Sequence, residues 1–286
     1  MFLILTAALC SVAVSILLKQ FNAKGFATLQ MLVWNYVSAM VLCFLWFKPN
    51  LAQVFVASSH TPWWLIATLG ILFPAVFMFL VQSLQYAGMM KTEIAQRLSV
   101  VLSLLAAYFI FNETFTALKF AGIVLGVFAV LCLLIAKNTA QNATSAKGMA
   151  FLALVWIGYA GVDILLKYNS SLGKSFTLSL NLIFIVAFVL TTLAQIFFSK
   201  TTWQFKNLPA GVLLGGLNFA NIALYIQAHQ QLKDSPAIVF MLMNMSVVIL
   251  GIIAGMGIFK EKPSRLTLVG LAMGIFGVLC LANTMA

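Results

Sequence analysis

The chain has 286 residues, of which 63% are hydrophobic and only 7% are charged, and its formal net charge is +11. Soluble domains carry about 25% charged residues, so these values exclude an ordinary water-soluble fold and indicate a chain surrounded by lipid. The basic residues lie singly in short gaps between apolar runs, which argues against a nucleic-acid-binding surface and is typical of membrane topology determinants.

Ten apolar segments follow one another along the chain, each near the roughly 20 residues that cross a bilayer as a helix. We predict spans at 2–20, 27–47, 63–86, 93–111, 117–136, 148–167, 176–198, 209–231, 236–258 and 265–283. Strands are not expected, because no segment alternates apolar and polar residues as a membrane barrel requires. The sequence therefore predicts an all-α integral membrane protein of ten transmembrane helices, in which the first segment is a span and not a cleaved leader.

The two halves of the chain repeat each other. Residues 111–134 align without gaps on residues 259–282 at an offset of 148, and the shared residues include two glycines and the run Val-Leu-Cys-Leu. We predict a first five-helix repeat at 1–140 and a second at 148–286, with the polar segment 137–147 as the linker. Because each half has an odd number of spans, the second half is expected to be inverted, a construction common among secondary transporters.

A short polar junction stands at the same place in each half, and a helix with glycines four residues apart follows it. The junctions are Asn112-Glu113-Thr114 and Lys260-Glu261-Lys262, and the glycines are Gly122 and Gly126 in one helix and Gly270 and Gly274 in the other. Small residues at this spacing let helices approach closely, so both helices are expected to be packing elements. Glu113 and Glu261 are interpreted as carboxylates that begin a helix and meet its unpaired amides, with a functional role as the alternative.

The junctions, the glycine-spaced helices and the ten-span pattern resemble the EamA type of the drug/metabolite transporter superfamily over the whole chain. The sequence departs from that family's pattern at Ser99 and Val247, where the fourth and ninth helices commonly carry proline. The resemblance implies a central cavity lined by helices 1, 3, 4, 6, 8 and 9, with helices 5 and 10 at the periphery. It also implies a secondary transporter in the bacterial inner membrane.

The expected function is export or exchange of a small polar or amphipathic metabolite, such as an amino acid, by alternating access at that cavity. A multidrug efflux carrier is the alternative within the same class. A channel or a non-transporting membrane subunit is the alternative from another class, although no repeated polar filter or ring of charges is present in the sequence.

Ionisable residues within spans are costly, so each is a candidate site. Glu93 and Arg97 are four residues apart at the start of the fourth span, and either pair with each other or leave Arg97 to bind an anionic substrate group. Asp163 in the sixth span matches Ser15 in the first half, so the repeat does not impose it. We therefore predict Asp163 as the preferred coupling carboxylate, against a plain ion pair, and Glu93 and His229 as further coupling candidates. Both proton-coupled and facilitated transport are compatible with the sequence.

Uncharged polar and aromatic side chains within the spans are candidate substrate contacts. Together with Arg97, they are Gln82, Tyr86, Trp156, Tyr159, Asn218, Tyr225 and Asn244. The aromatic residues either form a wall for a flat substrate or anchor the helices at the membrane interface. The asparagines either bind substrate or hydrogen-bond a neighbouring helix.

The sequence offers little for catalysis. Its two histidines and five acidic residues form no metalloprotease-like motif, and its four cysteines stand singly in apolar stretches. We expect no enzyme activity, no metal and no cofactor. The expected partners are the lipid bilayer and a small-molecule substrate, and a homodimer is an open possibility.

The distribution of basic residues predicts the orientation in the membrane. Eleven Lys and Arg residues fall in the gaps after the odd-numbered spans, and five fall on the other side. Because basic residues are retained in the cytoplasm, both termini are expected to face out, opposite to the arrangement that the family resemblance suggests.

Overall fold

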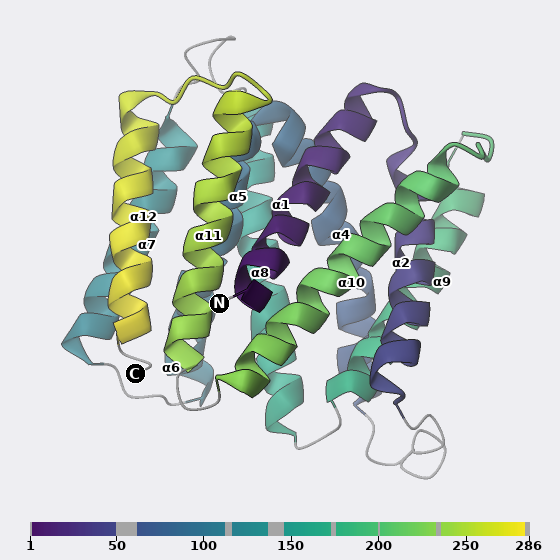
Figure 1. Cartoon of the computed structure of the whole chain (residues 1–286), viewed down its shortest axis with the longest axis horizontal. Helices are drawn as coiled ribbons and strands as arrows, with labels where there is room; N and C mark the ends of the chain where they lie inside the picture. Colours follow the sequence, from purple (N-terminus) through teal and green to yellow (C-terminus); the bar gives the residue numbers. More distant parts are fainter. Residues whose placement is uncertain are drawn as a thin grey trace. The chain divides into compact units, whose positions relative to one another are not determined.

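The structure is a computed structural model that describes residues 2–49, 62–111, 116–136, 146–172, 176–199, 201–232 and 236–283. The described residues form helices joined by turns and short irregular segments, with no strand among them. The helices, shown in Figure 1, are α1 (Phe2–Ala23), α2 (Thr28–Phe47), α4 (Trp63–Tyr86), α5 (Met89–Arg97), α6 (Ser99–Phe111), α7 (Ala117–Ile135), α8 (Ala146–Ser171), α9 (Phe176–Phe197), α10 (Asn207–Gln231), α11 (Pro236–Gly257) and α12 (Arg265–Asn283).

The helices occupy the predicted spans, and most ends agree within a few residues. Within the described chain, seven helices are long and apolar enough to cross a membrane. The apolar parts of α11 and α12, Leu242–Gly257 and Arg265–Leu281, are shorter. Side chains such as Phe120, Phe128 and Phe276 are exposed although strongly apolar, as lipid-facing residues are. The prediction of an all-α integral membrane protein is confirmed.

The fourth predicted span differs from the expectation in two respects. It begins at Met89, earlier than position 93, and a one-residue break at Leu98 divides it into α5 and α6. The break lies next to Ser99, where the family pattern places a proline, although this chain has none there. In the second half, α11 continues through Val247 without a break.

The described chain divides into two compact units, each of which takes segments from both predicted halves. The first unit comprises Met1–Lys19, Phe79–Gly161 and Ala220–Ala286, and the second comprises Gln20–Met78 and Val162–Phe219. The boundaries fall within α1, α4, α8 and α10. The assignment of 1–140 and 148–286 as inverted repeats concerns the sequence relationship of the halves, and it stays a prediction.

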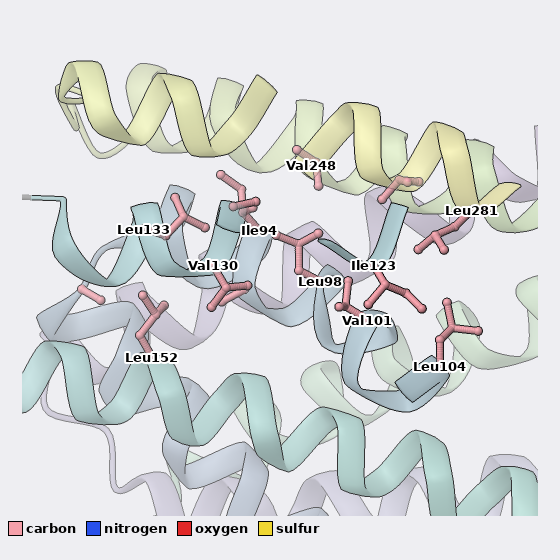
Figure 2. Close-up of a cluster of buried hydrophobic side chains, with 14 residues drawn as sticks. Ile94, Leu98, Val101, Leu104, Ile123, Val130, Leu133, Leu152, Val248 and Leu281 are labelled. Atoms are coloured by element: carbon pink, nitrogen blue, oxygen red, sulfur yellow. The ribbon is translucent and has the colours of Figure 1, made fainter. Parts of the chain in front are cut away.

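In the first unit, α7 and α12 pack side by side along their glycines (Figure 1). A Cβ atom at Gly122 would lie 3.0 Å from the carbonyl oxygen of Gly277, and one at Gly270 would lie 3.0 Å from that of Ala129. The backbones thus approach as closely as the glycine spacing predicts. Figure 2 shows the apolar cluster to which both helices contribute, where Leu98, Val101 and Ile123 point into a shared core.

In the second unit, α2 packs against α9, and polar side chains fix the neighbouring chain segments. Gln30 of α2 donates to the carbonyl of Thr202 at 2.8 Å and accepts from Asn207 Nδ2 at 2.6 Å. Asn181 of α9 donates to the carbonyl of Met40 at 3.0 Å. These amides satisfy backbone and side-chain groups within the unit, so their role is structural.

Candidate functional site

The break in the fourth span is held by a side chain from the second half of the sequence. The carbonyl of Leu98 accepts a hydrogen bond from the Val101 amide at 3.1 Å, and a second from the indole Nε1 of Trp156 at 3.0 Å. Trp156 lies on α8, in the same unit. The backbone carbonyl at the break is therefore satisfied within an apolar bundle, and this favours the persistence of the break without proline.

A polar cluster lies between α1 and α5, next to this break. It consists of Ser11, Ser15, Glu93 and Arg97, and we call it the α1–α5 polar cluster. Arg97 Nη2 donates to Ser11 Oγ at 2.6 Å. Glu93 is 1% exposed, and neither carboxyl oxygen has a hydrogen-bond partner among the described residues; the same holds for Arg97 Nε. The sequence left two interpretations, a direct pair of Glu93 with Arg97 or an Arg97 that binds substrate. The structure does not contain the direct pair.

A small cavity adjoins the cluster. Arg97 and Asn244 contribute to its otherwise apolar lining, with residues of α5, α11 and α12 around them. Its volume is about 10 Å³, room for about one water molecule. Asn244 Nδ2 donates to the carbonyl of Phe240 on its own helix at 2.8 Å. This space is therefore too small to hold a metabolite.

Glu261 is a second carboxylate of the same unit, and both of its oxygens have partners. Its oxygens accept from the amides of Met89 and Met90 at 2.6 and 3.0 Å, and Lys19 Nζ lies 2.5 Å from Oε1. A Cβ atom at Gly88, where φ is +93°, would lie 3.0 Å from that oxygen, so the turn before α5 requires glycine.

These contacts correct the prediction that Glu261 begins its own helix. Helix α12 does not start until Arg265, so Glu261 lies before it and caps α5 instead. It still meets unpaired amides and the positive end of a helix dipole, which was the physical basis of the interpretation. Glu113, for which the same role is predicted, lies outside the described residues.

The remaining candidates of the first unit are dispersed over α4, α8 and α10. Tyr86 is exposed and stacks on Phe151, with ring centroids 6.0 Å apart. Tyr225 contacts His229 edge to face, with centroids 4.6 Å apart. Gln82 and Tyr159 are half-buried. These placements neither assemble the residues into one pocket nor assign them a role, so their contact with substrate stays a prediction.

Two candidates belong to the second unit. Asn218 Nδ2 donates to Asn35 Oδ1 at 2.8 Å, which matches the helix-bonding alternative for this asparagine. Asp163, the carboxylate preferred from the sequence, lies on an exposed part of α8. Burial therefore distinguishes the two acids, and the coupling roles of Asp163 and Glu93 both stay predictions.

Sequence reasoning missed Ser11 and the pairing of Lys19 with Glu261. Ser11 and Ser15 are four residues apart on α1, and this spacing places two hydroxyls on one helix face. The 148-residue offset relates Lys19 to Lys167 as well as Glu113 to Glu261. A lysine and a glutamate that recur together in both halves were a usable signal for a pair.

Comparison with known proteins places the chain in a family. The EamA-like transporter family matches residues 1–135. An uncharacterized protein of Haemophilus influenzae is 35% identical over 280 residues, which cover 96% of this chain and 95% of that protein. The chain belongs to the EamA-like transporter family. This EamA-like protein also shares its fold with a protein of known crystal structure, at a TM-score of 0.58 and 16% identity, covering 98% of this chain and 99% of that one.

Membership in the EamA-like family, part of the drug/metabolite transporter superfamily, identifies the chain as a member of a family of membrane transporters. The described residues contain no group of three or more His, Cys, Asp or Glu side chains that is arranged to bind a metal ion.

Proposed function

We propose that this EamA-like protein is a secondary transporter that exports or exchanges a small polar or amphipathic metabolite, such as an amino acid, by alternating access in the bacterial inner membrane. The observation that carries the proposal is the broken fourth span, with the α1–α5 polar cluster beside it in an otherwise apolar bundle. Discontinuous helices with buried polar groups are a recurring feature of secondary transporters.

The cluster favours a substrate that carries an anionic group. Arg97 keeps part of its donor capacity unused at Nε, and its Nη2 bond to Ser11 is exchangeable for a bond to a ligand. A guanidinium is suited to carboxylate or phosphate oxygens because its donors form a planar fork. A zwitterionic amino acid or an organic acid fits this chemistry better than a purely cationic drug.

The substrate can be identified by ligand stabilisation of the purified protein. A panel of amino acids, organic acids, nucleobases and aromatic cations is screened for an increase in the melting temperature of the protein in detergent. Binding at 100 times Kd stabilises the folded state by about 2.7 kcal/mol, which is measurable. Arg97→Gln should abolish the shift for an anionic ligand, and Lys24→Gln, at an exposed turn outside the cluster, should retain it.

Transport is then tested with the labelled hit in proteoliposomes. A carrier gives saturable uptake that unlabelled substrate inside the vesicles accelerates. Flux that neither saturates nor responds to internal substrate would indicate a channel. If no ligand of the panel stabilises the protein and none crosses the bilayer, the chain would be a non-transporting subunit and the proposal would fail.

A further inference from the structure

Glu93 occupies a position where the oxygens of a charged carboxylate have no hydrogen-bond partner among the described residues, and only the charge of Arg97 and the Ser15 hydroxyl nearby compensate it in part. Glu93 is the fifth residue of α5 and 1% exposed. The backbone of α11 covers it, since a Cβ atom at Gly251 would lie 2.8 Å from Glu93 Cγ. Burying an isolated carboxylate is far more costly than burying the neutral acid, so this environment selects the protonated form.

Arg97 is the expected counter-ion of Glu93, and it lies nearby but is hydrogen-bonded to another residue. Arg97 lies one helical turn beyond Glu93, a spacing at which the two side chains can meet. Its Nη2 instead donates to Ser11 Oγ on α1. A modest change of the Arg97 rotamer would exchange the serine hydroxyl for the Glu93 carboxylate. Acid and base are thus adjacent but separated while α11 packs over Glu93.

The other elements around α5 supply no second counter-ion for Glu93. Arg97 is the ionisable group whose charge acts on it, and Ser15 is the neighbouring hydroxyl. On α1, Lys19 is 2.5 Å from Glu261; on α5, Lys91 Nζ donates to the carbonyl of Ala136. Helix α11 has no ionisable residue in its sequence. The remaining ionisable residues of the first-unit segments that pack near α5 are Cys10, Tyr86, Tyr108, Lys119, Cys132, Lys147, Tyr159, Arg265 and Cys280.

We infer that Glu93 is a proton-exchange site whose occupancy is linked to the packing of α11 on α5. While Gly251 covers the side chain, Glu93 carries a proton. When α11 withdraws and water enters, the Glu93 O–H bond breaks, the proton passes to water, and the carboxylate pairs with the Arg97 guanidinium. The reverse sequence reloads the proton. This inference rests on the proposed transport function, to which it adds the coupling ion.

The protonation state can be measured without a substrate. The chain has five acidic residues, so the infrared carbonyl band of a protonated carboxylic acid can be assigned by single substitutions. We expect this band in the full-length protein in nanodiscs at neutral pH, its loss in Glu93→Gln, and its retention in Glu261→Gln. Absence of the band, or a band that Glu93→Gln leaves unchanged, overturns the inference.

A second measurement uses the unaltered protein, in case Glu93→Gln does not fold. A hydrophobic carbodiimide reacts with protonated carboxyl groups in apolar surroundings, and digestion with mass spectrometry locates the adduct. Glu93 should be labelled at neutral pH, and labelling should fall as the pH rises. Labelling of Asp163 with none at Glu93 would overturn the assignment and restore the carboxylate chosen from the sequence.

The link to transport is tested with the substrate found by the stabilisation screen. For each variant, uptake driven by a pH gradient is divided by exchange without a gradient, so that differences in total activity cancel. Glu93→Gln should lower this ratio at least tenfold, and Asp163→Asn should not. An unchanged ratio in Glu93→Gln overturns the proton-exchange inference and leaves the transport proposal standing. Absence of exchange in the wild-type protein overturns the transport proposal, and the infrared result then still tests the protonation of Glu93.

Discussion

Glu93 and Glu261 lie within one unit of the protein and show two solutions to the burial of a carboxylate. Glu261 accepts from two backbone amides and pairs with Lys19, whereas neither oxygen of Glu93 has a hydrogen-bond partner among the described residues. The first arrangement is what stability requires, because every acceptor is used. The second costs stability, and such costs are found where ionisable groups change state.

The structural role of Glu261 leads to a prediction at the residue scale. Glu261→Ala removes the cap of α5 and leaves Lys19 without its ion-pair partner, so we expect a loss of about 2 kcal/mol in the free energy of unfolding. The loss is read as a lower melting temperature of the purified protein in detergent.

Glu261→Gln is the matched variant, because its carbonyl oxygen still accepts one of the amides. It should lose less stability than Glu261→Ala. Equal melting temperatures for Glu261→Ala and the wild-type protein would show that the cap and the ion pair contribute nothing to stability.

The candidate residues could be found from the sequence, but their partners could not. Glu93, Arg97 and Trp156 are conspicuous because polar groups are rare in apolar spans. Their contacts depend on tertiary pairing: Arg97 meets a serine 86 positions away, and Trp156 meets a carbonyl 58 positions away. No local pattern encodes such distances, so the preference for Asp163 rested on the repeat alone.

At the scale of the helices, glycines set how closely neighbours approach. A Cβ atom at Gly215 of α10 would lie 2.4 Å from the carbonyl oxygen of Asn35 and 2.7 Å from Ser38 Cβ on α2. At the adjacent Gly216, a Cβ atom would meet nothing within 4 Å. Two neighbouring glycines in one helix therefore have different structural roles.

This difference predicts opposite effects of the same substitution. Gly215→Ala should force α10 away from α2 and destabilise the protein by about 1–3 kcal/mol, as overpacking does. Gly216→Ala should stabilise it by up to about 1 kcal/mol, because alanine is the better helix former. Melting temperatures in the same detergent give the comparison. If both variants shifted the melting temperature equally and in the same direction, the contact of Gly215 with α2 would not explain the effect.

Helix positions were predictable because each apolar run of bilayer length has only one way to satisfy its backbone in lipid. The break at Leu98 was not predictable in the same way. It lies between Arg97 and Ser99 inside a predicted span, without the proline that would have marked it, and it depends on an indole from α8. The glycine spacing predicted that α7 and α12 are packing elements, but it did not identify either helix as the partner of the other.

At the scale of the whole molecule, the distribution of charge leads to a prediction of topology. Eleven basic residues lie in or near the gaps after the odd-numbered spans and five lie in or near the gaps on the other side, so both termini are expected outside the cytoplasm. An alkaline phosphatase fused to the C-terminus should be active, and a green fluorescent protein at the same point should stay dark.

The opposite pattern of reporter activity would place the termini inside. In that case the basic residues would be concentrated on the outer side, against the rule that governs most membrane proteins. The predicted inversion of the halves would be unaffected, because it depends on the odd number of spans in each half and not on which side is cytoplasmic.

The bond between Trp156 and Leu98 also bears on how this family can vary. A bend produced by proline is encoded within its own segment, whereas the break in this chain depends on the indole of Trp156, which is distant in the sequence. Proline at the break and an indole that donates to the Leu98 carbonyl are therefore alternative ways to stabilise the same break. Relatives that lack tryptophan at the position of Trp156 should therefore carry proline at the position of Ser99, and an alignment of many sequences would reveal the exchange as correlated change at two sites far apart in the chain.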